Sequence, residues 1–420
     1  MEGQNRKRLL KNTVMLYILT FSNYFLSLAV VPYETRILGK EVYGVLGVAT
    51  AIMVYFQLVI DFGFLMSATQ DVSRNREDKG FLSRTFTAVT LCKGVLVLFS
   101  GAVLAVLVRV IPAWQEHAGI YLLFFLGTAL NGLIPDYLYR GLENMAAITI
   151  RTVCIKAFFT ACILLFMKSP ADLWMAPAAT AVGNGAAALV CVFDVKRRFG
   201  IRFCRVGVRE MGDHLKRSSV FFYSRIATTA YSALNTIILD LISAGGAPTS
   251  FYTAADKLMT TGKSAVSPIS DSMYPYMVKH RDFKLVKKVL LIAEPLIILF
   301  CAGVFIFAEP FCRLVFGEEF AETGQVLRAM LPVGVVILPS YILGFPTLSA
   351  MGLSKYANTS VIAGSAFHLA VMAALYFTGN MNMITLGLAV SATECVILGI
   401  RVAVVVRCRG RMKEERDECA

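Results

Sequence analysis

The sequence predicts an all-α integral membrane protein, with about twelve transmembrane helices in two six-helix lobes around a central cavity. Three observations lead to this fold class. Of the 420 residues, 57% are hydrophobic and only 16% are charged, whereas soluble domains are about 45–50% apolar and about 25% charged. The apolar residues form long runs, and the basic residues gather in alternate connections between those runs.

A helix that crosses the hydrocarbon core of a bilayer needs about 20 apolar residues. Twelve runs near that length follow one another, at residues 9–31, 42–64, 82–108, 119–139, 146–167, 173–195, 219–241, 249–277, 289–307, 326–348, 356–377 and 383–406. They use nearly the whole sequence, so we expect no attached soluble catalytic domain. The first run is too long for a signal-peptide core and lacks a clear cleavage site, so we expect it to be retained.

The distribution of Lys and Arg predicts the orientation of these helices. If the N-terminus is cytoplasmic, the inner segments include residues 6–11, 74–84, 196–217, 279–288 and 407–416. The outer connections then hold few basic residues, namely Arg36, Lys40, Arg109, Lys168 and Arg313. By the positive-inside rule, both termini are cytoplasmic in a multi-pass protein of the inner membrane. The net charge of +13 then reflects topology and requires no nucleic acid.

Two segments of similar sequence suggest an internal repeat. "RGLENMAAITI" at 140–150 and "MGLSKYANTSV" at 351–361 each follow a proline-containing apolar run and open the next one. Because six helices separate them, both halves would cross the membrane in the same sense, as a parallel pseudo-repeat. The predicted division is an N-terminal lobe at 1–195, a basic cytoplasmic linker at 196–217, a C-terminal lobe at 218–406 and a charged tail at 407–420.

We find no motif in the sequence that is typical of an enzyme or a metal-binding protein. The ten cysteines are scattered without a C-x-x-C pair, which argues against a disulfide framework and a structural zinc site. "TGKS" at 261–264 resembles the end of a phosphate-binding loop, but Lys257 stands where that motif needs glycine. We find neither H-E-x-x-H nor G-x-S-x-G. We therefore expect a transporter without cofactor or metal, not an enzyme.

Polar side chains mark the helices expected to line a water-filled path. Unpaired polar groups in hydrocarbon cost several kcal/mol, so they face the bundle interior or a wet cavity. In the first, seventh and eighth runs they recur every three or four residues, on one helical face. They are Tyr17, Thr20, Tyr24 and Ser27, then Arg225, Thr228, Ser232 and Asn235, then Thr249, Tyr252, Asp256, Thr260, Lys263 and Ser267, and the second run adds Tyr55, Gln57 and Asp61.

Each charged group in these runs also has a structural interpretation. Lys263 can pair with Asp256 or with Asp271 for packing alone. Arg225 lies near the cytoplasmic end of its run and can snorkel to the interface. Lys257 stands about 100° from the polar face, so snorkelling or pairing suits it as well as ligand contact. Asp61 has no basic residue three or four positions away, which leaves ligand, proton and inter-helix roles open.

Four motifs together carry a family resemblance: "RILGKEVYG" at 36–44, "DFGFLMSATQDVSRNRED" at 61–78, "RGLENM" at 140–145 and "MGLSKY" at 351–356. In order and spacing, across essentially the whole chain, they resemble the oligosaccharide flippases of bacterial polysaccharide biosynthesis. These O-antigen and capsule repeat-unit exporters belong to the multidrug/oligosaccharidyl-lipid/polysaccharide exporter superfamily. The resemblance implies a V-shaped cavity between two lobes that opens alternately to each side. It also implies that Gly39 permits a tight turn in the first hairpin, on the outer face.

A lipid-linked oligosaccharide is the cargo that this resemblance implies. Each sugar hydroxyl desolvated without a partner costs about 2–7 kcal/mol, so a polar groove must cover the sugars while the prenyl tail stays in lipid. We expect the hydroxyl and aromatic groups of the polar faces to contact them: Tyr17, Thr20, Tyr24, Ser27, Thr228, Ser232, Asn235, Thr249, Tyr252, Thr260 and Ser267. Cations are expected to bind the pyrophosphate, first Arg225 and Lys263, then Lys257 and Arg36. For Arg36, capping of the first helix is the alternative.

The membrane potential favours export of an anion by about 2.3 kcal/mol per charge per 100 mV, so no ATP site is needed. Asp61 or Asp256 are candidates for coupling to protons or sodium. Three other functions remain open. A multidrug or organic-cation antiporter would prefer a more acidic cavity, and a flippase for a cell-wall lipid precursor would use the same fold. A membrane glycosyltransferase or polymerase usually has larger outward loops. Expected partners are the lipid-linked substrate, the bilayer, and the polymerase and glycosyltransferases of the same pathway.

Overall fold

The structure is a computed structural model that describes residues 2–229, 233–243 and 245–408. It describes their side chains except those of residues 2–21, 23–25, 27, 224, 227–229 and 275. Within these residues the elements are helices, and there is no strand. Nine helical stretches in this part of the chain are long and apolar enough to cross a membrane. The predicted all-α, multi-pass membrane fold is confirmed, and the count of twelve stays a prediction.

The helices form two compact units. Unit 1 comprises residues 1–229 and 236–246, and unit 2 comprises residues 230–235 and 247–420. The first nine helices belong to unit 1: α1 (Glu2–Asp61), α2 (Phe64–Arg74), α3 (Lys79–Val110), α4 (Pro112–Gln115), α5 (Ala118–Gly132), α6 (Asp136–Gly141), α7 (Met145–Phe166), α8 (Met175–Arg198) and α9 (Val208–Thr229). The short helix η1 (Pro170–Trp174) precedes α8, and α10 (Leu234–Ser243) runs from residues of unit 2 into residues of unit 1.

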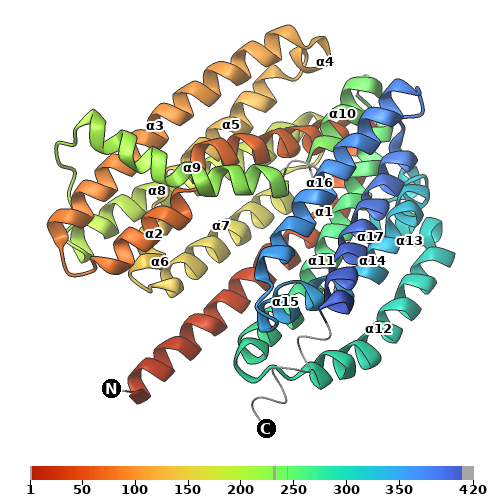
Figure 1. The fold of residues 1–420 in the computed structure, drawn as a ribbon. Coiled ribbons are helices and arrows are strands. Elements are labelled where there is room, and N and C mark those ends of the chain that lie inside the picture. The colour runs from red at the N-terminus through yellow and green to blue at the C-terminus, as the bar shows by residue number, and fades with distance from the viewer. Residues whose placement is uncertain (1, 230–232, 244, 409–420) are drawn as a thin grey trace. The chain divides into compact units, whose positions relative to one another are not determined.

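A glycine divides the long first helix. Gly39 has φ 70° and ψ 175°, outside the helical region, although both flanks are helical. Because a side chain at that φ is strained, glycine is the residue that permits the change of direction, which Figure 1 shows in the red ribbon of α1. The two apolar runs predicted at 9–31 and 42–64 therefore lie on either side of Gly39, as expected.

Unit 1 is held together by a core at one end of its helices. Phe64, Val72, Phe86, Leu138 and Ile148 belong to one buried apolar cluster drawn from α2, α3, α6 and α7. Asp78 caps α3, since its Oδ1 accepts a hydrogen bond from the backbone N–H of Phe81 at 2.9 Å. Burial of apolar side chains and a satisfied helix end thus fix the same region, where α2, α3 and α6 meet.

Unit 2 packs around α14. Its elements are α11 (Ala247–His280), α12 (Phe283–Ile306), α13 (Ala308–Phe316), η2 (Glu318–Phe320), α14 (Thr323–Ile342), η3 (Leu343–Thr347), α15 (Leu348–Ala350), α16 (Ser354–Phe377) and α17 (Met383–Arg407). Helix α14 contacts α11, α12 and α17, which lie beside it in Figure 1. Met273, Met277, Val286, Leu338 and Ile342 form a buried cluster between α11, α12 and α14.

Helix α9 crosses one of the predicted domain boundaries. It spans the end of the predicted linker and the beginning of the predicted C-terminal lobe, and its residues belong to unit 1, where it contacts α2 and α3. Nothing tests the division at residues 195 and 218, which stays a prediction. The predicted tail at 407–420 lies almost wholly outside the described residues.

Candidate functional site

A buried ion pair joins α1 to α3 in unit 1. Lys93 Nζ lies 3.2 Å from Asp61 Oδ1 and donates a second hydrogen bond of 2.7 Å to the carbonyl of Gly132. The Lys93 side chain is 7% exposed and that of Asp61 is 21% exposed. Charges inside a membrane protein are rare, and they pair with one another or with backbone carbonyls. Of the roles left open for Asp61, inter-helix pairing is present, and ion coupling stays a prediction.

Two amides extend this pair into a network. Gln57 Nε2 donates to Asp61 Oδ2 at 3.0 Å, and Asn131 Nδ2 donates to Gln57 Oε1 at 3.2 Å. Asp61 therefore accepts hydrogen bonds on both carboxylate oxygens. Such a network satisfies its buried polar groups and fixes the positions of α1, α3 and α5 relative to one another.

A second ion pair lies in unit 2. Lys263 Nζ on α11 is 2.7 Å from Glu394 Oε1 on α17, and the two side chains are 22% and 7% exposed. The sequence offered Asp256 and Asp271 as packing partners, whereas the hydrogen-bonded carboxylate is Glu394. Asp256 interacts electrostatically with both Lys257 and Lys263. Lys263 thus interacts with two carboxylates of unit 2, with Glu394 through a hydrogen bond and with Asp256 electrostatically.

A hydrogen-bonded chain runs through the helices around this pair. Asn235 Nδ2 donates to the hydroxyl of Tyr252 at 2.8 Å, and Asn235 Oδ1 lies 3.0 Å from His368 Nε2. The other ring nitrogen, Nδ1, lies 2.8 Å from Thr393 Oγ1. Because the amide oxygen of Asn235 only accepts, the nitrogen of His368 that faces it carries a proton. Thr393 directly precedes Glu394 on α17, so the chain ends one residue away in the sequence from the second ion pair.

A buried arginine, Arg401, connects three helices of unit 2. Arg401 on α17 donates from Nε to Ser360 Oγ at 3.0 Å, and from Nη1 to the carbonyl of Ser340 at 2.6 Å. The backbone of η3 departs from helical geometry at Gly344, where a Cβ atom would lie 3.0 Å from Arg401 Nη1. The arginine therefore fills the space left by this glycine and joins α14, α16 and α17.

The structure places the remaining predicted site residues individually. Arg36 and Arg225 are exposed, Lys257 is half-buried, Thr260 is exposed and Thr249 is fully buried. Ser267 donates to the carbonyl of Ser264 in its own helix. Among the predicted site residues with described side chains, Asn235 and Tyr252 are hydrogen-bonded to each other, and Asp256 lies within electrostatic range of Lys257 and Lys263. The following predicted contacts lie outside the described side chains: Tyr17, Thr20, Tyr24, Ser27, Thr228 and Ser232.

Several residues of the networks were missed in the sequence, among them Lys93, His368, Glu394 and Arg401. Each lies in a run that is otherwise strongly apolar and belongs to no repeated polar face, so a search for polar faces passes over it. The signal that identifies them is the position of an ionisable group in the middle of a membrane run, which by itself marks a functional candidate.

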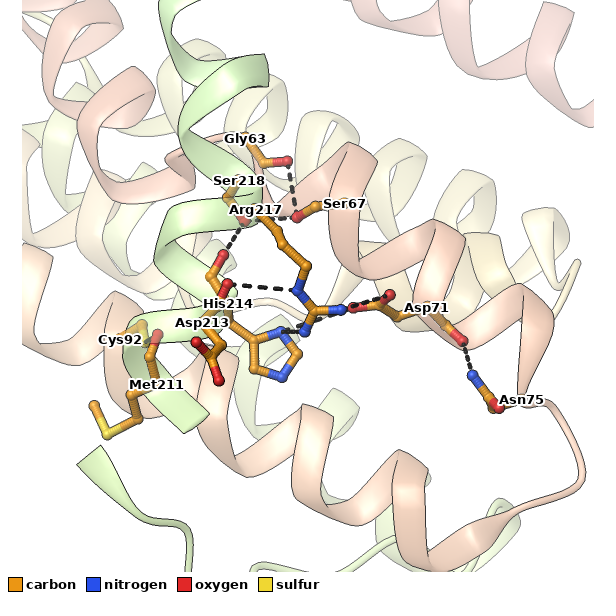
Figure 2. A network of polar contacts seen from close by, with 10 residues as sticks. All are labelled: Gly63, Ser67, Asp71, Asn75, Cys92, Met211, Asp213, His214, Arg217 and Ser218. Atoms are coloured by element: carbon orange, nitrogen blue, oxygen red, sulfur yellow. Dashed lines mark hydrogen bonds and ion pairs between the residues drawn. The ribbon is translucent and has the colours of Figure 1, made fainter. Parts of the chain in front are cut away.

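A further network joins α2 to α9 in unit 1 (Figure 2). The hydroxyls of Ser67 and Ser218 lie 2.6 Å apart, and Ser218 Oγ donates to the carbonyl of His214 at 2.8 Å. Arg217 Nη1 donates to Asp71 Oδ1 at 3.2 Å, and its Nη2 lies 3.2 Å from His214 Nδ1. The close approach at this crossing requires a glycine, because a Cβ on Gly63 would lie 2.6 Å from the carbonyl oxygen of Ser218.

The contact between α2 and α9 is expected to weaken in acid. Burial lowers the pKa of His214, and the nearby Arg217 lowers it further, while Asp71, Glu210 and Asp213 act in the opposite direction. The folded protein then takes up a proton less readily than the unfolded chain, whose histidines titrate near pH 6.5. This contribution to stability is therefore complete above about pH 6.5 and falls as the pH drops below it.

Hydrogen exchange of the α9 amides measures this effect. Exchange should become faster between about pH 7 and pH 5.5, after correction for the intrinsic rate, and His214→Gln should remove the additional dependence. His280→Gln is the matched control, because His280 is exposed on α11. If wild type and His214→Gln respond alike, His214 does not govern the contact.

A family model described as "Polysaccharide biosynthesis protein" matches residues 9–281, more than half of the chain. The chain belongs to the polysaccharide biosynthesis protein family. The matched residues include the Asp61–Lys93 pair and three of the four motifs that carried the resemblance, whereas "MGLSKY" and Glu394 lie beyond them.

Two curated relatives align with the chain over nearly its whole length. A protein of Escherichia coli (strain K12) named "Putative O-antigen transporter" is 24% identical over 96% of this chain and 97% of its own. A protein of Shigella dysenteriae with the same name is 26% identical over 92% of this chain and 98% of its own. The family resemblance stated from the motifs is thereby confirmed.

Solved structures show the fold. The lipid II flippase MurJ, in an inward closed conformation, matches with a TM-score of 0.67 and 14% identity, over 94% of this chain and 87% of that one. An inward-facing multidrug resistance MATE family transporter of the MOP superfamily matches with a TM-score of 0.68 and 13% identity, over 97% and 100%. The chain thus shares the fold of a flippase and of a drug transporter, and identities this low do not specify its cargo.

Proposed function

We propose that the protein is a flippase that moves a prenyl-pyrophosphate-linked oligosaccharide from the cytoplasmic to the outer leaflet by alternating access. The observation that carries this proposal is membership of the polysaccharide biosynthesis family, together with relatives named as O-antigen transporters that align over nearly the whole chain. The carried repeat unit would serve O-antigen, capsule or exopolysaccharide synthesis. The fold shared with transporters is consistent with transport and not catalysis.

Basic side chains on the membrane helices can bind the pyrophosphate of such a cargo. The pyrophosphate needs cations, and Lys263 lies half-buried on α11, where the carboxylate of Glu394 holds its ammonium group. In our proposal the head group competes with Glu394 for Lys263, and Arg225 contributes a guanidinium able to bind two phosphate oxygens. Lys257 and Arg36 are further cations, and Arg36 lies close to the turn at Gly39.

Sugar hydroxyls need hydrogen-bonding partners along the path. The proposed contacts are the hydroxyl, amide and aromatic groups named from the sequence on the first, seventh and eighth runs. Asn235 and Tyr252 are hydrogen-bonded to each other in the structure. We propose that this hydrogen bond breaks before either side chain contacts sugar. Asp61 and Asp256 remain the proposed groups for coupling to protons or sodium, each beside a lysine.

The proposed location follows from the basic residues. A multi-pass protein with both termini in the cytoplasm places the dense basic segment 196–217 at the inner face. Glycosyltransferases that build the repeat unit and a polymerase that joins the exported units are the proposed partners in the pathway.

Transbilayer movement of cargo in proteoliposomes tests the proposal. The probe is a fluorescent prenyl-pyrophosphate oligosaccharide, and accessibility to an added quencher reports the leaflet. We expect the wild type to exchange this probe faster than protein-free vesicles, and Arg225→Ala to slow the exchange about tenfold, the loss of one charge-assisted contact. Arg209→Ala, at an exposed position on the same helix, is the matched control.

Two alternative cargoes are included in the same assay. A lipid II-type probe tests the cell-wall precursor, and an organic cation with an imposed proton gradient tests drug antiport. Faster movement of either probe than of the oligosaccharide lipid would overturn the assigned cargo. No movement of the oligosaccharide probe, with folded protein confirmed by its thermal transition, would also reject it.

A further inference from the structure

A groove between α7 and α8 is separate from the networks described above. Its volume is about 530 Å³, and it lies wholly within unit 1. Ile150, Val182 and Val190 line it and are 59%, 59% and 64% exposed. Side chains this apolar, on helices that cross the membrane, face hydrocarbon. The groove therefore opens to lipid, and it lies on the fifth and sixth predicted runs, not on those proposed to line the transport path.

The two ends of the groove differ in character. Helices α7 and α8 run antiparallel, because the short segment at 167–174 joins them, so the beginning of α7 and the end of α8 lie at the same end. Arg151, Asp194 and Arg198 line the groove there, and Phe158 and Ala186 line it further along. The groove is thus polar at the end that faces the cytoplasm in our topology, and apolar toward the membrane interior.

The polar end carries a surplus of positive charge. Four basic residues, Arg151, Lys196, Arg197 and Arg198, lie at this end against two carboxylates, namely Asp136, which pairs with Arg151 at 2.5 Å, and Asp194, which accepts a hydrogen bond of 2.8 Å from Tyr139. Arg198 stands over the ring of Phe199 at 5.7 Å and makes no ion pair with any described residue. Lys196 and Arg197 beside it are exposed. The arginine at the groove end is thus available to an anion.

We propose that this groove binds an anionic phospholipid, with the phosphate at Arg198 and an acyl chain between α7 and α8. Apolar lining with cations at the level of the head groups matches the two parts of such a lipid, and basic groups between membrane helices bind anionic head groups. A second copy of the chain would bring the same basic end against itself, because symmetric contacts repeat the same surface. Charge repulsion therefore disfavours that occupant.

Native mass spectrometry of the purified full-length protein tests the site. Lipid-depleted protein is titrated with phosphatidylglycerol or, separately, phosphatidylethanolamine, and the fraction carrying one bound lipid is recorded. We expect phosphatidylglycerol to bind more tightly, and Arg198→Gln to weaken it about fivefold, the effect of one basic residue near an anionic head group. Arg197→Gln is the matched control, because it removes an equal charge one residue away and does not line the groove.

A second variant tests the acyl-chain part without touching charge. Ala186 is exposed in the groove, so Ala186→Leu narrows the groove without displacing the core, and we expect it to weaken binding of phosphatidylglycerol as well. If Arg198→Gln and Arg197→Gln weaken binding of phosphatidylglycerol equally, the effect comes from general surface charge and the proposed site is overturned. Equal binding of both phospholipids, displacement of phosphatidylglycerol by a prenyl phosphate at equimolar amounts, or a dimer that Ala186→Leu disrupts would also overturn it.

Discussion

Replacing Lys93 by methionine is expected to lower the free energy of unfolding by about 1–3 kcal/mol, because it leaves the partly buried carboxylate of Asp61 without its cation. Methionine keeps the length of the side chain, so the loss reports charge and hydrogen bonding more than packing. The measurement is unfolding of the purified protein in mixed micelles, followed by circular dichroism. Lys79→Met is the control, since Lys79 is exposed at the beginning of α3, and it should change stability by less than about 0.5 kcal/mol.

The double variant Asp61→Asn with Lys93→Met separates structure from function. Removing both charges should restore most of the stability, because a buried ion pair contributes little beyond what neutral partners supply. The amide at position 61 can still accept a hydrogen bond from Gln57. If Asp61 couples transport to an ion, the refolded double variant should lose the ion dependence of flipping. If the double variant is as unstable as Lys93→Met, the ion pair is not the source of the effect.

Replacing Lys263 by glutamine is expected to lower kcat/KM for movement of the pyrophosphate-linked probe about 10- to 100-fold. One hydrogen bond to a charged group is worth about 1.5–3 kcal/mol, and in our proposal the ammonium group of Lys263, which pairs with Glu394 in the structure, binds the pyrophosphate during transport. Glu394→Gln removes the competitor, so it should lower KM for the same probe. The measurement is the initial rate of flipping against the mole fraction of probe.

Lys263→Gln is expected to lower kcat/KM, whereas Glu394→Gln is expected to lower KM and so to raise kcat/KM. These opposite changes make the test specific. A lysine that serves only packing would give losses of stability in both variants and unchanged kinetics in the folded fraction. Lys279→Gln serves as the control for charge, because this exposed lysine lies in the last turn of the same helix. A fall in rate with Lys279→Gln as large as with Lys263→Gln would assign the effect to the net charge of the membrane surface.

The fold class could be predicted from composition because the bilayer requires long apolar helices whatever their packing. Gly39 could also be predicted as a turn, since a short charged corner between two apolar runs needs a residue that tolerates positive φ. Interruptions within runs were harder to predict. The run at 119–139 is divided between α5 and α6, and the run at 326–348 between α14, η3 and α15. Tertiary contacts, such as the hydrogen bond from Arg401 to the carbonyl of Ser340, support the interrupted backbone there.

The candidate site was predicted in part, for a physical reason. A face of repeated polar residues on α11 is visible in one helix, so Asp256 and Lys263 could be named from their spacing. The partner of Lys263 lies on α17, more than a hundred residues later, and spacing within a helix carries no information on contacts between helices. Lys93 illustrates the same limit, because its partner Asp61 lies on another helix.

The buried position of Lys93 has a consequence for the biogenesis of the protein. A lysine in the middle of a helix opposes membrane insertion by about 2.5–3.5 kcal/mol, while each Leu, Ile, Phe or Val favours it by about 0.3–0.6 kcal/mol. Helix α3, Lys79–Val110, is rich in these residues, so it can enter the bilayer with its lysine still unpaired. Because α1 is synthesised before α3, Asp61 is already present when Lys93 enters the bilayer. We expect formation of the Lys93–Asp61 pair to move α3 from contact with lipid into contact with α1.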